Sequence, residues 1–242
     1  MGEAKRRRQT GQTAPRSKDR KPVIIGMAVL VVALVAALVA FLTRPPAPVS
    51  EELPVAAPDA EPYPEELDQY GVSVGQADAP VVVREFADYQ CPACARFSDA
   101  ASRLKREYVE SGKVRFVFYD MPLRQHANAM PAAQAARCAG DQGSYWQMHN
   151  LLFDRQTEWS GSDAPLAVFA RYAGDLGLDD RRFRNCMITE LHREAVEDSL
   201  TVARQLQITS TPTVLVDNIR LTRPGWGQLS AVVERELNSN GQ

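Results

Sequence analysis

A strand pattern followed by a helix pattern stands out in the middle of the chain. Residues 81–87 are largely apolar, and residues 94–108 place apolar side chains at successive spacings of 3, 4, 3 and 4. The first pattern is typical of a buried strand and the second of an amphipathic helix. Residues 114–119 predict a second strand, so the three elements form a βαβ unit. Its two strands are expected to be parallel, because the helix carries the chain back across the sheet.

The pattern changes to helical between about 125 and 207, where alanine-rich and leucine-rich stretches are interrupted by glycines. Residues 213–217 and 219–221 then predict a β-hairpin around Asn218, and residues 228–237 predict a closing helix. This helix is expected to turn four apolar side chains inward: Leu229, Val232, Val233 and Leu237. The order of elements predicts one α/β domain over 70–242, with a helical insertion at about 125–207.

The beginning of the chain differs in composition from the rest. Residues 1–22 carry eight basic and two acidic side chains, whereas residues 23–42 contain no charge and no proline. A helix of about twenty such residues can span a bilayer. The basic flank predicts that residues 1–22 stay in the cytoplasm and that the chain beyond the span lies outside. We therefore predict a cytoplasmic basic tail and one transmembrane helix that anchors an extracytoplasmic or periplasmic domain to the inner (cytoplasmic) membrane.

A cleaved signal peptide is the alternative for this segment. The apolar core of a signal peptide usually has about 7–15 residues and ends in small residues at the cleavage site. Residues 41–46, Phe-Leu-Thr-Arg-Pro-Pro, form a poor cleavage site, which favours an uncleaved anchor. Because topology explains the basic residues beside a membrane span, the sequence does not favour nucleic-acid binding.

A linker rich in proline and acidic residues is predicted over 43–69. Between Pro45 and Glu66 the chain has seven prolines, six acidic residues and no basic ones. This composition offers too little apolar surface to build a core and predicts an extended, solvated tether. Beyond Arg44 the chain has 19 basic and 28 acidic residues, a balance that argues against binding to anionic lipid headgroups.

Two cysteines, Cys91 and Cys94, lie where the first strand passes into the helix. Free backbone N–H groups and the helix dipole favour an anion at a helix N-terminus, which lowers the pKa of the first thiol. Pro92 suits the first helical position because its missing N–H has no helical partner there. Cys94 lies one turn along and can close a small disulfide ring with Cys91. Cys91 is therefore the predicted nucleophile and Cys94 the resolving thiol.

A zinc site and a purely structural disulfide are the alternatives for this pair. Zinc requires further cysteines or histidines close by, whereas Cys138 and Cys186 stand alone in the sequence and the chain has three histidines. A disulfide across so short a loop constrains the unfolded chain little. Redox chemistry is the favoured interpretation, without a metal or another cofactor.

The Cys91–Cys94 motif after a strand, the helical insertion, and Thr211–Pro212 before a hairpin together resemble the thioredoxin-fold disulfide oxidoreductases of the DsbA type. The match covers about residues 70–238. The resemblance implies that Pro212 is cis and packs beside the active-site sulfurs, and that the backbone of Thr211 pairs with an extended substrate segment. It further implies reoxidation by a quinone-linked membrane oxidase.

Glu85, six residues before Cys91, matches the buried acidic residue of this family. A carboxyl group beneath the dithiol can take or return the proton of Cys94, provided that burial raises its pKa. The alternative is a strand glutamate that points to solvent. Asp88 and Tyr89 lie nearer the motif and are expected at the rim of the site, without a catalytic role.

The sequence does not decide in which direction the redox reaction runs, and several functions are compatible with it. The Pro-Ala pair between the cysteines lacks the histidine of strongly oxidising DsbA-type sites, which predicts a less oxidising couple. Threonine before the cis proline also resembles isomerase-type members, but these carry a dimerisation domain where this chain offers a tether. A monomeric oxidase of reduced or misoxidised exported proteins is the favoured prediction. The alternatives are a reductase or isomerase of the same fold, and a non-catalytic tethered chaperone or interaction module.

The remaining cysteines, Cys138 and Cys186, fall in the predicted insertion. In an exported protein two further cysteines most simply form a structural disulfide. Two buried free thiols and an auxiliary redox pair are the alternatives. The three tryptophans are expected to pack rather than to bind a ligand: Trp146, Trp159 and Trp226.

Overall fold

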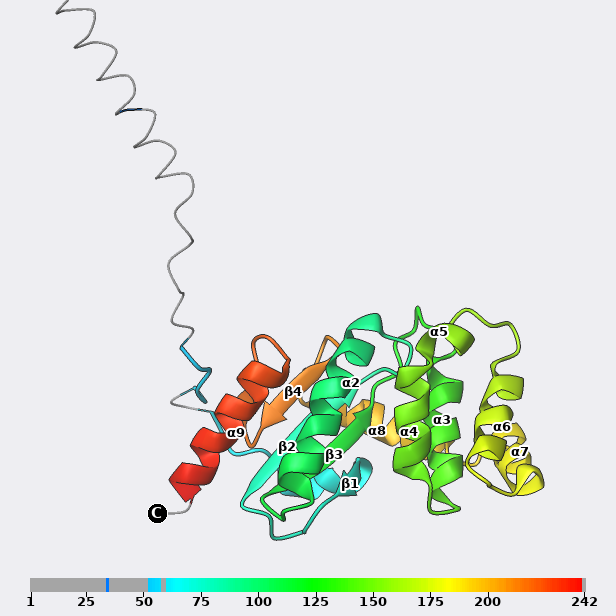
Figure 1. The fold of residues 1–242 in the computed structure, drawn as a ribbon, viewed down its shortest axis with the longest axis horizontal. Coiled ribbons are helices and arrows are strands. Elements are labelled where there is room, and N and C mark those ends of the chain that lie inside the picture. The colour runs from blue at the N-terminus through cyan, green and yellow to red at the C-terminus, as the bar shows by residue number, and fades with distance from the viewer. Residues whose placement is uncertain (1–33, 35–51, 58–59, 241–242) are drawn as a thin grey trace, which may run out of the picture. The chain divides into compact units, whose positions relative to one another are not determined.

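A five-stranded mixed sheet lies at the centre of the domain (Figure 1). The structure is a computed structural model and describes residues 34, 52–57 and 60–240. The strand order is β1-β3-β2-β4-β5, with β2 and β3 parallel and the other pairs antiparallel. The strands are β1 (Val72–Val74), β2 (Val81–Ala87), β3 (Val114–Asp120), β4 (Thr213–Val216) and β5 (Ile219–Arg220). The predicted parallel pair and hairpin are confirmed, and β1 is a strand that the sequence pattern did not predict.

Helices cover both faces of this sheet. On one face lie α2 (Pro92–Leu104), its π-helical continuation η2 (Lys105–Val109) and α9 (Trp226–Asn240). On the other face lie α8 (Arg193–Gln205) and the 3-10 helix η1 (Glu65–Tyr70). Because both faces are buried, β2 and β3 are mostly apolar and show no regular alternation of apolar and polar residues.

Neighbouring residues of β2 point to opposite faces of the sheet. Val83 belongs to the apolar cluster under α2 and α9, whereas Phe86 belongs to the cluster under α8 and η1. By the same alternation Glu85 points toward α2, and Arg84 points toward η1, where it contacts Asp68. Two adjacent buried ionisable side chains therefore lie in different layers of the molecule.

The helical insertion predicted at about 125–207 is confirmed, and its first helices lie beside the sheet (Figure 1). They are α3 (Ala129–Gly140), α4 (Tyr145–Asp154), α5 (Gln156–Trp159), α6 (Pro165–Asp175) and α7 (Asp180–Ile188). Trp159 is fully buried, with its ring centroid 5.4 Å from that of Phe169. Trp146 and Trp226 are partly buried against the same core, so all three tryptophans pack as predicted.

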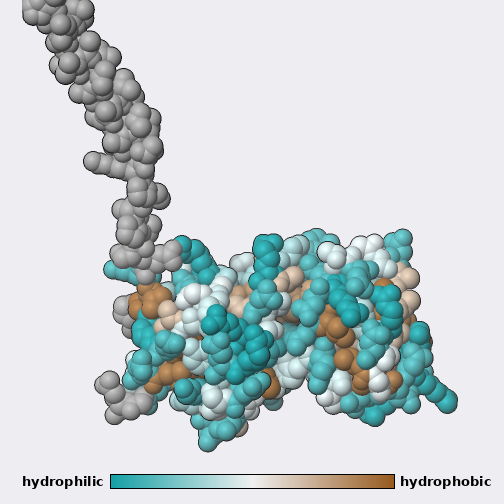
Figure 2. All heavy atoms as spheres, viewed as in Figure 1, coloured by the Kyte–Doolittle hydropathy of each residue, from teal (hydrophilic) through white to brown (hydrophobic). Residues whose placement is uncertain are grey.

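Hydrophilic residues cover most of the face seen in Figure 2, where hydrophobic residues appear in small separate patches. The large hydrophobic side chains that are exposed in the described part of the chain are scattered: Leu34, Val55, Tyr70, Ile188 and Leu191. Single exposed apolar side chains are normal on a protein surface. The molecule's large aromatic residues are used mainly for packing.

The structure differs from the predicted linker, 43–69, in the part that it describes. Leu53 packs partly buried against the main core, and Leu67 of η1 is buried against the second cluster. The compact unit accordingly begins at Glu52 rather than at residue 70. The average composition of this segment does not reveal that it packs against the domain, because only a few apolar side chains and one buried carboxylate make the contacts.

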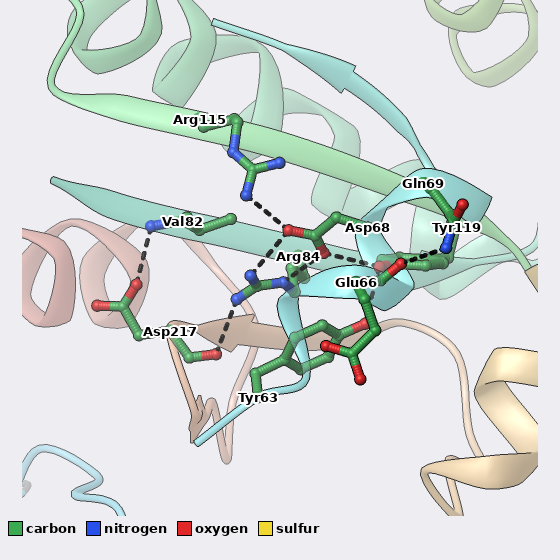
Figure 3. A network of polar contacts seen from close by, with 9 residues as sticks. All are labelled: Tyr63, Glu66, Asp68, Gln69, Val82, Arg84, Arg115, Tyr119 and Asp217. Carbon is green, nitrogen blue, oxygen red and sulfur yellow. Dashed lines mark hydrogen bonds and ion pairs between the residues drawn. The ribbon is translucent and has the colours of Figure 1, made fainter. Parts of the chain in front are cut away.

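That carboxylate belongs to a buried ionic network that fastens η1 to the sheet (Figure 3). Asp68 accepts two hydrogen bonds from Arg84, at 2.7 and 2.9 Å. It accepts further bonds from Arg115 at 2.6 Å and from Tyr119 at 2.8 Å. Tyr63 donates to the Tyr119 hydroxyl at 2.7 Å, and its ring centre lies 3.8 Å from the Arg84 guanidinium carbon. Asp68 is 6% exposed and Arg84 2%, so charge pairing replaces water for both.

The predicted cytoplasmic tail (1–22) and transmembrane helix (23–42) lie outside the described residues, Leu34 excepted. Among the residues that the structure does describe, no helix has both the length and the apolar character needed to cross a membrane. The anchor stays a prediction from sequence.

Candidate active site

Cys91 is the residue immediately before α2 and occupies its N-cap position. Its backbone is extended, with φ −75° and ψ 121°, and Pro92 begins the helix as predicted. The carbonyl oxygen of Cys91 accepts hydrogen bonds from the N–H groups of Cys94 and Ala95, both at 3.1 Å. Cys91 is 8% exposed and Cys94 fully buried, and both are free thiols. Of the two sulfurs, that of Cys91 is the one that another molecule can reach.

The surroundings of Cys91 favour its thiolate. They lower the pKa of Cys91 to about 5, chiefly because the Cys94 thiol hydrogen-bonds to its sulfur. Partial burial opposes this change, whereas Thr211 and the backbone N–H groups of Ala93 and Cys94 support it. At neutral pH Cys91 is therefore a thiolate, which is the form that disulfide exchange requires.

Cys94 has the opposite character. Burial raises the pKa of Cys94 well above its usual value, and its hydrogen bond to Cys91 and the nearby Glu85 carboxylate raise it further. At neutral pH the reduced pair thus keeps one proton, which Cys94 holds. Because a resolving thiol must lose its proton as it attacks, the site needs a proton acceptor next to Cys94.

Glu85 is placed to meet this need. It is 1% exposed and points toward α2, so the alternative of a solvent-facing glutamate is excluded. Burial raises the pKa of Glu85 to about 8, and the positive charge of Lys105 opposes the rise. Its Oε1 atom has no hydrogen-bond partner within the described structure. Glu85 is therefore protonated at neutral pH and titrates close to it, as a proton donor and acceptor should.

Lys105 is a neighbour of the site that the sequence analysis missed. Burial lowers the pKa of Lys105 to about 8, and Glu85 opposes the change. Its Nζ atom donates to Asn150 at 3.2 Å and lies 4.6 Å from the centre of the Trp146 ring. A signal was present in the sequence, because Lys105 stands four residues after Ala101, on the apolar stripe of the helix pattern.

Replacing Glu85 by glutamine is expected to remove a pH-dependent loss of stability. The unfolded chain ionises Glu85 near pH 4.5 and the folded chain near pH 8, so the folded state holds the proton more tightly and stability falls as pH rises between these values. Between pH 5 and pH 8 the wild type is expected to lose about 2–4 kcal/mol relative to Glu85→Gln. Urea unfolding across this range measures the difference.

The matched control for this experiment is Glu110→Gln, because Glu110 is exposed. Its stability profile is expected to parallel that of the wild type. If the stabilities of the wild type and Glu85→Gln changed with pH in the same way, the raised pKa of Glu85 would be contradicted.

The cis-proline loop completes the site. The Thr211–Pro212 peptide bond is cis, as the family resemblance implies. The Cys91 sulfur lies 3.7 Å from the Thr211 carbonyl oxygen, to which it donates when it is protonated, although 120 residues separate the two. The Thr211 hydroxyl is buried and has no hydrogen-bond partner among the described residues, so it is free to donate to a Cys91 thiolate. Thr211 and Pro212 are half-buried, which leaves their backbone within reach of an extended peptide.

Asp88 and Tyr89 are not rim residues as the sequence suggested, because the structure buries each to 1% exposure. The carboxylate of Asp88 accepts hydrogen bonds from the Gln90 and Leu123 N–H groups, at 2.6 and 2.8 Å. The Tyr89 hydroxyl is hydrogen-bonded to Nδ1 of His149 at 2.8 Å. The chain between β2 and α2 turns inward beneath the insertion, which explains why distance along the sequence from Cys91 did not indicate exposure.

Gln156, the first residue of α5, contacts the backbone of the active-site loop. Its Nε2 atom donates to the carbonyl oxygen of Tyr89 at 2.6 Å and to that of Cys91 at 3.0 Å. The insertion therefore holds the backbone of Cys91 in place. The sequence carries no signal for this role, because a glutamine in a helical region does not indicate its partner.

Cys138 of α3 and Cys186 of α7 form a disulfide. The bond links residues 48 positions apart and joins two helices of the insertion, as predicted for a structural pair. Crosslinks over loops of this size usually stabilise a fold by constraining its unfolded chain.

An accessible thiolate paired with a buried thiol is suited to sulfur exchange, and this fold supplies both next to a cis proline. The site therefore has the geometry that thiol–disulfide exchange requires, in a domain of thioredoxin fold. A model of the thioredoxin family matches residues 68–235, and the chain belongs to that family.

Two curated relatives differ in how much of their length they share with this chain. The probable disulfide bond formation protein D of Bacillus cereus is 29% identical over 171 residues, which is 68% of this chain and 78% of that protein. The Na(+)/H(+) antiporter NhaA 3 of Salinispora tropica is 35% identical over 147 residues, which is 60% of this chain. The chain spans 21% of the length of that antiporter.

Solved structures agree on the fold. The oxidised form of BdbD from Bacillus subtilis aligns with a TM-score of 0.64 and 23% identity, covering 77% of this chain and all of that one. The α-DsbA1 protein of Wolbachia pipientis aligns with a TM-score of 0.63 and 19% identity, covering 70% of this chain and 92% of that one. Both likenesses support the thioredoxin-like fold with a helical insertion.

Proposed function

We propose that this protein is an extracytoplasmic oxidase that introduces disulfides into exported proteins through Cys91 and Cys94. The observation that carries the proposal is the lowered pKa of Cys91, about 5, beside a buried thiol. A stabilised thiolate makes the reduced form of a dithiol more stable, so the corresponding disulfide is a stronger oxidant.

Oxidation of a substrate begins when a substrate thiolate attacks the sulfur of Cys91 in the Cys91–Cys94 disulfide. A substrate–Cys91 bond forms, the disulfide breaks, and Cys94 leaves as a thiolate. Glu85, protonated at neutral pH, gives its proton to this sulfur. A second substrate thiolate then attacks the substrate sulfur of the mixed disulfide, which releases an oxidised substrate and the Cys91 thiolate. Two electrons have passed to the Cys91–Cys94 pair.

Substrate docking is proposed at the cis-proline loop. The half-buried backbone of Thr211 lies next to the Cys91 sulfur, so an extended substrate segment bound there by backbone hydrogen bonds would bring its sulfur to Cys91. Reduced or misoxidised exported proteins are the proposed substrates. The domain is proposed to act as a monomer.

Attachment to the cytoplasmic membrane is proposed from the uncharged segment 23–42 and its basic flank. The proposed reoxidant is a quinone-linked membrane oxidase, which accepts the two electrons from the reduced pair.

The reduction potential of the Cys91–Cys94 couple tests the direction of the reaction. The full chain, purified in detergent, is equilibrated in glutathione buffers, quenched in acid and alkylated. The tryptic peptide Glu85–Arg96 carries both cysteines, so mass spectrometry separates this couple from Cys138–Cys186. A potential nearer about −120 mV than about −270 mV is expected for an oxidase. A value near the lower figure would favour a reductase, and an isomerase would be distinguished by its rearrangement of scrambled disulfides.

A further inference from the structure

The strongest unassigned cluster of side chains lies where α3, α7 and the start of α8 meet. Cys138, Cys186 and His192 bring their sulfur and nitrogen atoms within 4.8 Å of one another. A carboxylate oxygen of Asp141 lies 2.9 Å from Nε2 of His192 and 3.7 Å from the sulfur of Cys186. The cysteines that stand alone in the sequence therefore belong, in the fold, to a cluster with a histidine and an aspartate.

These four groups are the kinds of ligand that zinc prefers. Two thiolates, an imidazole and a carboxylate supply the soft and borderline atoms of a tetrahedral Zn²⁺ site. While the Cys138–Cys186 disulfide is intact, its sulfurs carry no negative charge and are poor ligands for zinc. We propose that reduction of this disulfide unmasks a zinc site formed by Cys138, Cys186, His192 and Asp141.

Contacts other than the disulfide also link the segments that carry these groups. Asp179 N–H donates to the side-chain oxygen of Gln142 at 2.9 Å, which ties the end of α3 to the start of α7. Arg182 donates to the Asp141 carbonyl oxygen at 2.8 Å. The turn between α7 and α8 is closed by a backbone bond from Leu191 N–H to the Cys186 carbonyl oxygen at 3.1 Å.

An entry path also exists. A surface groove of about 590 Å³ is lined by Asp141, Cys186 and Leu191, among others. Cys186 is 6% exposed, whereas Cys138 is 1% exposed. A small reductant and then a metal ion can approach from the Cys186 side, whereas Cys138 forms the closed wall of the site. Arg182 also lines the groove and offsets the negative charge that two thiolates and a carboxylate leave around one zinc ion.

The chemistry balances with a dithiol as the reductant. A dithiol gives two electrons and two protons, the Cys138–Cys186 bond breaks, and two thiols form while the reductant becomes a disulfide. Zn²⁺ then displaces the two thiol protons to solvent as the zinc–sulfur bonds form. His192 binds as a neutral imidazole.

The test uses the full chain with Cys91→Ser and Cys94→Ser, so that the active-site pair cannot bind metal. The chain is reduced with dithiothreitol, and the reductant is removed under anaerobic conditions. The protein is then titrated with Co²⁺ and afterwards with Zn²⁺. One equivalent of Co²⁺ is expected to give thiolate charge-transfer bands and the intense visible bands of tetrahedral cobalt, which Zn²⁺ then abolishes. The unreduced chain is expected to show neither band.

The ligand assignment is tested by His192→Asn, with His126→Asn as the matched control, since His126 lies outside the cluster. Zinc affinity is expected to fall by at least about tenfold in His192→Asn and to stay unchanged in the control. Asp141→Asn is expected to weaken binding by about 10–100-fold.

Three results would overturn the proposal. They are no metal binding by the reduced chain, equal affinity in His192→Asn and its control, and a reduced chain whose circular dichroism is that of an unfolded protein with and without zinc. A zinc-dependent return of the folded spectrum would support it. Since the background lacks Cys91 and Cys94, failure here leaves the proposed oxidase function untouched.

Discussion

Replacement of Cys91 by serine is expected to lower the rate of thiol–disulfide exchange by more than about a thousandfold. The reaction passes through a covalent bond to the Cys91 sulfur, and a serine hydroxyl stays protonated and forms no such bond. The other sulfur of the motif is buried and cannot take over. Oxidation of a reduced, two-cysteine peptide, followed by mass spectrometry, measures the loss.

Replacement of Cys94 by serine is expected to give a different result from Cys91→Ser. The Cys91 thiolate can still attack a substrate disulfide, which forms a mixed disulfide and releases one substrate thiolate, but no resolving thiol is present to release the adduct. Covalent adducts to Cys91 should accumulate and disappear on addition of dithiothreitol. The pair of variants thus separates the attacking sulfur from the resolving one.

The double replacement of Cys138 and Cys186 by serine is the control for loss of cysteine as such. It lies in the insertion, outside the dithiol motif, and is expected to keep exchange activity at temperatures at which the chain stays folded. Full activity of Cys91→Ser would contradict the proposed function and favour a chaperone or interaction module whose Cys91–Cys94 pair is structural.

The features of this molecule that could be predicted from sequence are those that depend on residues close together in the chain. The apolar run of β2, the apolar stripe of α2 and the cysteines at their junction can be read from spacing alone. The cis geometry of Thr211–Pro212 could not be read in this way. A bare X–Pro sequence predicts trans, and only the order of motifs shared with a family indicated cis.

The parts that could not be predicted depend on partners distant in the sequence. Gln156 reaches the Cys91 carbonyl across 65 residues, and His192 joins Cys138 and Cys186 only after three helices have packed. Lys105 is an intermediate case. Its position on the apolar stripe of the helix indicated that this lysine is unusual. Its electrostatic interaction with Glu85 could not be predicted, because it depends on how the helix packs against the sheet.

Asp68 is the clearest example of such a dependence, and replacing it by asparagine is expected to destabilise the fold by about 3–5 kcal/mol. The segment around it is acidic and proline-rich, so its composition indicates a solvated linker. In the fold its carboxylate faces Arg84 and Arg115, and its loss leaves the buried Arg84 charge without its partner. Urea unfolding at neutral pH measures the effect. Glu66→Gln, an exposed neighbour on η1, is expected to change stability by less than about 0.5 kcal/mol.

The pH dependence of the stability lost in Asp68→Asn distinguishes loss of charge from loss of packing at this position. Burial works against ionisation of Asp68, but its hydrogen bonds and charge pairing with Arg84 outweigh burial and hold its pKa below the usual value. A depressed pKa contributes stability above the unfolded value of 3.8, and this contribution is lost as pH falls through the folded value. The difference in the free energy of unfolding between the wild type and Asp68→Asn should therefore become smaller at acid pH. At neutral pH the backbone amides of η1 should exchange hydrogen faster in Asp68→Asn than in the wild type. A gap that stays constant down to acid pH would show that packing, rather than charge, fastens this segment to the sheet.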